Sequence, residues 1–154
     1  LRLIYEIFEQ HNIFFWLSDG TALGFARDND IIDWDDDIDL AIWDKDHKKL
    51  LDCLPELKQN GFEVAEVIMG GTFIVLLRNN EKVDIDIVGA KHKCSPPQQH
   101  PCTDVIPHLR RFKRIVIDRL TYNIPHQGYL KFAYGKTWRI PQNSKPNIIN
   151  KLFN

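Results

Sequence analysis

The sequence has few cysteines, no long hydrophobic run and almost no net charge. Its 154 residues include three cysteines, too few for the disulfide framework of a small secreted domain. No apolar stretch is long enough to cross a membrane, and no signal-peptide pattern opens the chain. A formal net charge of −1 gives no general attraction to nucleic acid or to an anionic membrane. The length predicts one domain with a proper core, and the first residue, Leu1, suggests a piece of a longer protein.

Two of the cysteines lie in a loop that also carries histidines. Cys94 and Cys102 stand near His92 and His100. These four residues could bind a zinc ion, or the two cysteines could pair in an oxidising compartment, although the spacing matches no standard zinc pattern. An ordinary loop is the third interpretation. Cys53 lies in a helical pattern, and we expect it to be buried.

The sequence does have an acidic run between residues 33 and 46. Seven of its fourteen residues are aspartates, with tryptophan, isoleucine and leucine interleaved among them. From Asp37 the pattern has period two, which predicts a strand with Asp37 and Asp39 on one face and Ile38 and Leu40 on the other. Two neighbouring carboxylates are costly unless a cation lies between them, and a hard divalent ion is the usual one. We interpret the run as a metal-binding strand.

The acidic run has two other interpretations. A solvated acidic face is the ordinary meaning of a charge run, but the alternating tryptophan and isoleucine residues argue against it. A helix–loop–helix calcium site would use the alternate aspartates as ligands. That loop needs glycine at its sixth position and glutamate at its twelfth, where this chain has Ile38 and Asp44.

A second strand with alternating aspartates follows later in the chain. Residues 83–88 place Asp84 and Asp86 on one face and aliphatic residues on the other. A hairpin over residues 73–88 would bring this strand beside the first acidic strand. Aspartate is disfavoured in strands, so two such strands indicate a shared site, although both rows of aspartates could instead face water.

A Gly-Thr turn precedes the acidic run. A short buried strand over Ile13–Leu17 leads into residues 18–21, and a short helix is expected over Ala22–Arg27. Such a junction presents backbone N–H groups and a helix N-terminus, which suit phosphate oxygens. Taken alone, Gly20 and Thr21 could equally form a structural turn.

The rest of the sequence predicts helices and strands in alternation. Helices are expected over residues 1–11, from Asp44 or Asp46 to about Asn60, and over Gln127–Tyr134; strands are expected over Phe62–Ile68, Phe73–Leu77, Ile115–Ile117 and Leu120–Ile124. In the second helix we expect Leu50, Leu51, Leu54 and Leu57 to face the core, and Pro55 to kink or restart the helix.

Together, carboxylates on two adjacent strands and a Gly-Thr turn suit the transfer of a phosphoryl-type group. Two carboxylates can bridge one or two Mg²⁺ ions, which hold phosphate oxygens and neutralise charge on the leaving group. A third carboxylate completes the metal shell or takes the proton of an attacking hydroxyl. The turn and Arg27 would steady the remaining phosphates.

The same motifs resemble a known family. Residues 19–27 read DGTALGFAR and residues 32–39 read IDWDDDID, which resembles the signature of the LicD family, GTLLGxxR followed by IPWDDDxD. The family also includes fukutin and fukutin-related protein. VDIDI at residues 83–87 resembles its second acidic strand. The YL and YGKTW motifs at residues 129–138, with Pro141, resemble its closing segment.

The resemblance implies an α+β nucleotidyltransferase-superfamily fold, a mixed β-sheet flanked by helices. It also implies a Mg²⁺- or Mn²⁺-dependent enzyme that transfers a phospho-alcohol, such as phosphocholine or ribitol phosphate, from a CDP-linked donor to a sugar hydroxyl of a glycan. The roles that it implies are metal binding by Asp37, Asp39 and Asp86, an acidic helper role for Asp35, and phosphate contacts by Gly20, Thr21 and Arg27. One domain is expected over residues 1–141, followed by a polar tail over 142–154.

Two departures from the family pattern limit what carries over. Asp33 stands where the family has proline, and the segment between the second acidic strand and the closing segment is reduced to residues 89–124. Since this segment is where acceptor recognition is expected, the resemblance does not determine the identity of the acceptor sugar. Two alternatives also remain: transfer of NMP from an NTP, and a non-catalytic module that binds metal or glycan. The compartment stays open between the cytoplasm of a bacterial relative and the Golgi lumen of a eukaryotic one.

Overall fold

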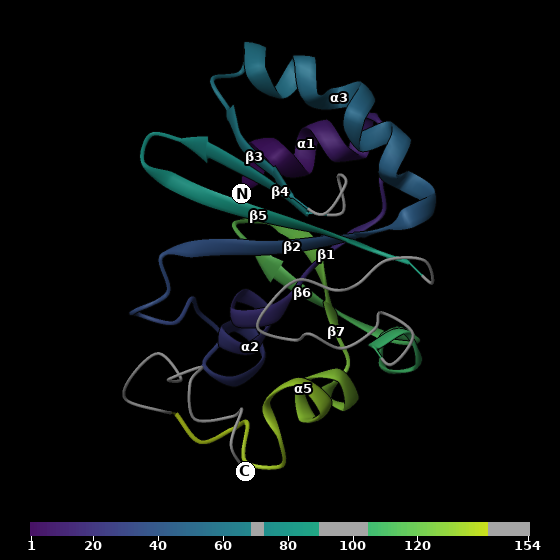
Figure 1. Ribbon diagram of the computed structural model, residues 1–154. Coiled ribbons are helices and arrows are strands. Elements are labelled where there is room, and N and C mark those ends of the chain that lie inside the picture. The colour runs from purple at the N-terminus through teal and green to yellow at the C-terminus, as the bar shows by residue number, and fades with distance from the viewer. Residues whose placement is uncertain (69–72, 90–104, 142–154) are drawn as a thin grey trace.

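A five-stranded mixed sheet forms the centre of the molecule. The computed structural model describes residues 1–68, 73–89 and 105–141, and the sheet has the order β1-β2-β5-β4-β3 (Figure 1). The strands are β1 (Phe15–Leu17), β2 (Asp37–Trp43), β3 (Glu63–Ile68), β4 (Phe73–Arg78) and β5 (Glu81–Val88). Strands β2 and β5 are parallel, and the other pairs are antiparallel. The expected α+β class with a mixed sheet is confirmed.

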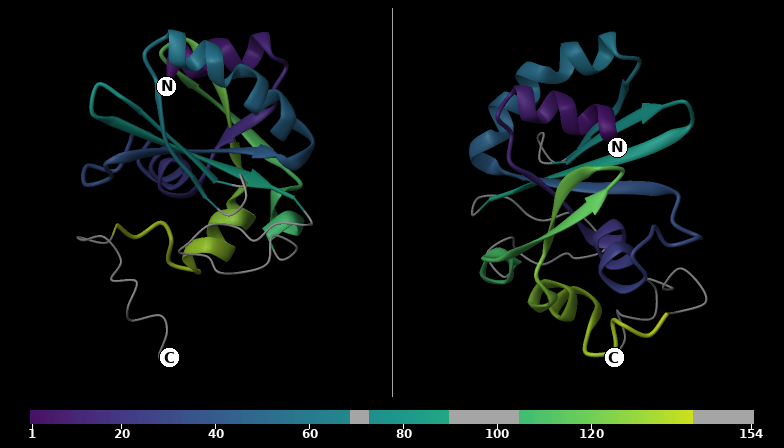
Figure 2. Two further views of the ribbon diagram at one scale, coloured as in Figure 1. Left: turned by 45° about the horizontal axis from the view of Figure 1, so that its top comes forward. Right: turned by 180° about the vertical axis from the view of Figure 1, so that it is seen from behind.

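Helices lie on both sides of this sheet. On one side are α1 (Arg2–Gln10) and α3 (His47–Gln59), and on the other are α2 (Asp19–Arg27) and α5 (Gln127–Tyr134) (Figure 1). A separate hairpin of β6 (Phe112–Ile117) and β7 (Leu120–Pro125) crosses beside β1 (Figure 2). The short 3₁₀ helices η1 (Asp44–Asp46) and η2 (Ile106–Leu109) complete the described elements.

The period-two pattern of the acidic strands separates a core face from a polar face. Leu40 and Ile42 of β2 and Ile85 of β5 are fully or almost fully buried in the core cluster that α1 and α3 cover. Asp37 and Asp39 project to the opposite side, toward α2. The predicted division of β2 into an aliphatic and a carboxylate face is therefore confirmed.

The helix before β3 differs from its prediction in one core position. Leu50 and Leu57 are buried, but Leu51 is 45% exposed because it lies on the solvent side of α3. Cys53 is buried as expected. Pro55 lies within α3, which continues through it as one element.

The second acidic strand, β5, pairs with the first along one edge and with β4, through a tight turn, along the other. Asn79 and Asn80 both have positive φ, at 52° and 65°, which is the geometry of a tight two-residue hairpin turn and suits asparagine. In the resulting sheet Asp39 lies opposite Asp84, and Ala41 opposite Asp86. The expected neighbourhood of the two acidic strands is confirmed.

Some expectations fall on residues that the structure does not describe. Cys94, Cys102, His92 and His100 lie in the segment 90–104, and the polar tail lies in 142–154, both outside the described residues. Among residues 1–68, 73–89 and 105–141, no helix is long and apolar enough to span a membrane.

Candidate active site

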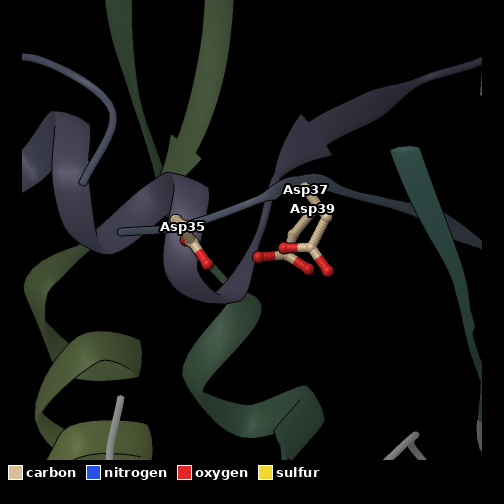
Figure 3. A group of neighbouring side chains, drawn as sticks. All are labelled: Asp35, Asp37 and Asp39. Carbon is tan, nitrogen blue, oxygen red and sulfur yellow. The ribbon is translucent and has the colours of Figure 1, made fainter. Parts of the chain in front are cut away.

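Three carboxylates meet where the acidic run enters β2. Asp35, Asp37 and Asp39 each offer an oxygen atom, and these atoms all lie within 4.8 Å of one another (Figure 3). All three side chains are half-buried. Carboxylate oxygens are the ligands that Mg²⁺ and similar hard cations prefer. This group of three could hold one metal ion.

The first turn of α2 is tied to β2 through Thr21. The Asp39 N–H donates a hydrogen bond to Thr21 Oγ1 at 2.8 Å, and the Thr21 N–H donates to Asp39 Oδ2 at 3.3 Å. Thr21 is completely buried. The Thr21 side chain therefore fixes the strand that carries the carboxylates, and the phosphate contact predicted for Thr21 stays a prediction.

Gly20 is required at this site because the carboxylates pack against its Cα. A Cβ added to Gly20 would overlap Asp35 Oδ2 and would lie 3.2 Å from Asp39 Oδ2. One turn later, a Cβ on Gly24 would lie 2.5 Å from the carbonyl oxygen of Asp30. The two glycines of the motif thus allow α2 to approach both the carboxylates and the loop that delivers them.

Replacement of Gly20 by alanine is expected to weaken metal binding without unfolding the protein. The new methyl group would displace the end of the Asp35 side chain, and mutation of a residue that supports a metal ligand commonly costs about 10–100-fold in metal affinity. Titration with Mn²⁺ by calorimetry measures this loss. Gly128→Ala is the matched control, because that exposed glycine has nothing within 4 Å of an added Cβ. Unchanged affinity in Gly20→Ala would show that Asp35 is not a ligand.

Burial and crowding of negative charge act together on these carboxylates. Burial, followed by the charges of Asp19, Asp37 and Asp35, raises the pKa of Asp39 to about 9, against the opposing hydrogen bond from Thr21. Burial also raises the pKa of Asp19, and the charge of Asp37 adds to it. In the metal-free protein Asp39 and Asp19 therefore bind protons more tightly than an exposed aspartate does, and a bound cation would displace these protons.

Helix α5 closes the site with two tyrosines. The Tyr129 hydroxyl donates a hydrogen bond to Asp19 Oδ1 at 2.7 Å. Burial, then the charge of Asp19, raises the pKa of Tyr129 well above its usual value. Burial and the charges of Asp19, Asp39 and Asp35 raise the pKa of Tyr134 in the same way. Both phenols therefore stay protonated, and the single donor of Tyr129 is used by Asp19.

Lys82 joins the two acidic strands. Its ammonium group donates hydrogen bonds to Asp37 Oδ2 and Asp84 Oδ2, each at 2.8 Å. Burial lowers the pKa of Lys82, but the bonds to the two carboxylates outweigh this effect and raise it overall. Lys82 therefore carries a permanent positive charge at the edge of the carboxylate group.

Two residues predicted for the site lie outside the group of three. Asp86 is on β5, opposite Ala41, and no described metal-ligand group includes it. Arg27 ends α2, about 10 Å along the helix axis from Gly20, and its guanidinium pairs with Asp28. The roles predicted for both residues stay predictions.

Four residues near the carboxylates had no role in the sequence-based prediction: Asp19, Lys82, Tyr129 and Tyr134. Lys82 directly precedes residues 83–88, and the period of two that places Asp84 and Asp86 on one face places Lys82 on the same face. The tyrosines belong to the closing segment of the family pattern, which gave them no function. Asp19 is the first residue of the DGTALGFAR motif, but only the fold reveals that Tyr129 contacts it.

The fold is that of nucleotidyltransferases. The lincosamide antibiotic adenylyltransferase LnuA with lincomycin bound superposes with a TM-score of 0.58 and 15% identity, over 87% of this chain and 84% of that one. The antibiotic-resistance factor ANT(2'')-Ia superposes with a TM-score of 0.60 and 15% identity, over 96% of this chain and 75% of that one. At this identity the likeness concerns the fold alone.

Within that fold class, the family is shown by the sequence. Residues 12–122 match the family described as LicD/FKTN/FKRP, nucleotidyltransferase domain, and the chain belongs to this family. An uncharacterized protein of Rickettsia prowazekii (strain Madrid E) is 38% identical over 61 residues, 40% of this chain and 23% of that protein. The ribitol 5-phosphate transferase FKRP of Mus musculus is 29% identical over 91 residues, 56% of this chain and 18% of that protein. The chain thus covers about a fifth of the length of these relatives.

Proposed function

We propose that this chain is the catalytic domain of a metal-dependent transferase. It would move a phospho-alcohol, of the phosphocholine or ribitol phosphate type, from a CDP-linked donor to a sugar hydroxyl of a glycan. The observation that carries the proposal is the packing of Asp35, Asp37 and Asp39 against the first turn of α2 in a LicD-family chain. The name of the mouse relative, a ribitol 5-phosphate transferase, supports the same chemistry here.

Each residue of the site has a role in this proposal. Asp35, Asp37 and Asp39 hold a Mg²⁺ or Mn²⁺ ion, which when bound neutralises charge on the phosphates of the donor. Gly20 keeps the surface beside the carboxylates free of a side chain. Asp86, on the neighbouring strand, completes the ligand set or accepts the proton of the sugar hydroxyl.

The proposed reaction exchanges one phosphorus–oxygen bond for another. The oxygen of the sugar hydroxyl bonds to the phosphorus that carries the alcohol, and the bond from that phosphorus to the CMP moiety breaks. The proton of the hydroxyl leaves to a carboxylate, and CMP leaves with the electron pair of the broken bond. The glycan gains a phosphodiester to the alcohol.

The product released from the nucleotide tests this proposal. The protein is incubated with Mn²⁺ and, separately, CDP-ribitol, CDP-choline, CTP and ATP, and the nucleotide products are separated by chromatography. Water can replace the unknown acceptor in a slow background reaction, so CMP from a CDP-alcohol is the expected result. Metal-dependent nucleotide binding with no product from any donor would indicate a non-catalytic module instead.

Transfer of NMP from an NTP is the second candidate. The fold likeness to proteins named as an adenylyltransferase and an antibiotic-resistance factor favours it, because the same carboxylate geometry serves both reactions. This activity would release pyrophosphate from CTP or ATP and leave both CDP-alcohols intact. The donor panel therefore separates the two candidates in one experiment.

A further inference from the structure

Lys82 occupies the space between the carboxylates of the two acidic strands. On the polar face of the sheet it lies directly opposite Asp37, and Asp84 follows it two residues along β5. The 2.8 Å contacts to Asp37 Oδ2 and Asp84 Oδ2 are made between partly buried groups: the side chain of Asp37 is 19% exposed and that of Asp84 is 12% exposed. The Lys82 side chain is 39% exposed, so water screens the two contacts from the ammonium side while both carboxylates are largely withdrawn from solvent.

We propose that the Lys82 ammonium takes the place of a second divalent ion, so that this site binds a single metal ion. The inference rests on the proposed metal-dependent function. Where phosphoryl-type transfer uses two ions, they lie about 3.5–4 Å apart and share carboxylates. In this chain the three-carboxylate group provides one cation position, and Lys82 fills the neighbouring position between β2 and β5.

The chemistry of the two contacts supports this assignment. An ion between the two strands would need Asp37 Oδ2 and Asp84 Oδ2, and Lys82 already bonds both atoms. A lysine ammonium is a compact point charge with three donors, so it can bond two carboxylates at once. Since a carboxylate has two oxygens, Asp37 can bond Lys82 through Oδ2 and still offer Oδ1 to an ion in the three-carboxylate group. Lys82 is therefore a positioning residue for Asp37 as well as a fixed charge.

Metal stoichiometry in a Lys82→Met variant tests the inference. Methionine keeps an unbranched stem and removes the charge. Lys58→Met, at an exposed position in the last turn of α3, is the matched control. Bound Mn²⁺ per chain is measured by equilibrium dialysis, and electron paramagnetic resonance detects coupling between neighbouring Mn²⁺ ions. We expect one ion per chain in the wild type and in Lys58→Met, and two coupled ions in Lys82→Met.

The other outcomes separate failure of this inference from failure of the proposed function. Two coupled ions in the wild type, or a single ion in a folded Lys82→Met protein, would show that Lys82 does not replace an ion. If Lys82→Met does not fold, Lys82→Arg is measured in its place. Arginine keeps the positive charge, so one bound ion is expected, and a second ion in Lys82→Arg or in the wild type would contradict the inference. No Mn²⁺ in any variant would overturn both the inference and the metal dependence of the proposed function, whereas one ion without CMP release would overturn only the proposed reaction.

Discussion

Replacement of Asp39 by asparagine is expected to reduce transfer strongly and also to stabilise the metal-free protein at neutral and alkaline pH. Asparagine has nearly the shape of aspartate, and its oxygen can still accept the Thr21 N–H bond. It lacks the charge that holds a divalent ion. Charge stabilisation by such an ion contributes several kcal/mol to the transition state, so about a 10³-fold loss of CMP release is expected.

The stability effect follows from the raised pKa of Asp39. An unfolded aspartate has a pKa of about 3.9, whereas burial and its negative neighbours raise that of Asp39 to about 9 in the folded state. The folded state thus binds the proton more tightly. The resulting stability is complete below pH ~4 and is lost as the pH rises toward 9. Asparagine does not titrate, so this loss is absent in the variant.

Thermal unfolding in a chelating buffer between pH 5 and 9 measures this difference. The melting temperature of the wild type should fall more steeply with pH than that of Asp39→Asn. Asp33→Asn is the matched control, because Asp33 belongs to the same acidic run, is exposed, and lies outside the three-carboxylate group. Activity of Asp39→Asn within tenfold of the wild type would exclude Asp39 as a metal ligand. Melting temperatures that fall equally with pH in the two proteins would contradict the raised pKa of Asp39.

Much of the fold could be predicted because alternation along a strand is local information. The pattern in residues 37–42 determines which side chains share a face, whatever the strand packs against. The tight turn at Asn79 and Asn80 then fixes the hairpin that carries Asp84. The turn pairs β5 with β4, whereas the neighbourhood of β5 and β2 was inferred from the alternating aspartates that both strands carry.

The third member of the carboxylate group could not be predicted in the same way. Asp35 precedes β2, in a turn where its N–H donates to the carbonyl of Ile32. The direction of its side chain depends on the close approach of Gly20 from another element. Strand periodicity does not extend into such a turn, so it places only Asp37 and Asp39 together. The family resemblance gave Asp35 the role of an acidic helper and gave Asp86 that of the third metal ligand.

Contacts between distant segments were equally inaccessible from the sequence. Tyr129 and Asp19 are 110 positions apart, and only the packing of α5 against α2 brings them together. The contact matters because a carboxyl group withdrawn from water costs free energy unless it is hydrogen-bonded, and Tyr129 supplies a donor to Asp19. The sequence contained both residues but no indication that they pair.

Toward β1, the polar face of the sheet becomes aromatic immediately beyond Asp39. The next residue on that face of β2 is Ala41, which lies opposite Trp16 of β1. The Trp16 ring packs against Trp43 at 4.8 Å and Phe112 at 5.2 Å between centroids, and only 1% of the residue is exposed. This aromatic cluster joins β1, β2 and the β6–β7 hairpin, so the position of β2 and its carboxylates depends on it.

Replacement of Trp16 by alanine is therefore expected to reduce the free energy of unfolding by about 3–5 kcal/mol, the usual cost of removing a fully buried large aromatic side chain. This is a large part of the total for a typical domain, about 5–15 kcal/mol. Urea denaturation measures the change. Phe14→Ala is the matched control, because Phe14 contacts the same Phe112 ring but is 39% exposed, and about 1 kcal/mol or less is expected for it. Equal losses in the two variants would show that the cluster does not connect the strands, because the buried ring would then contribute no more than the exposed one.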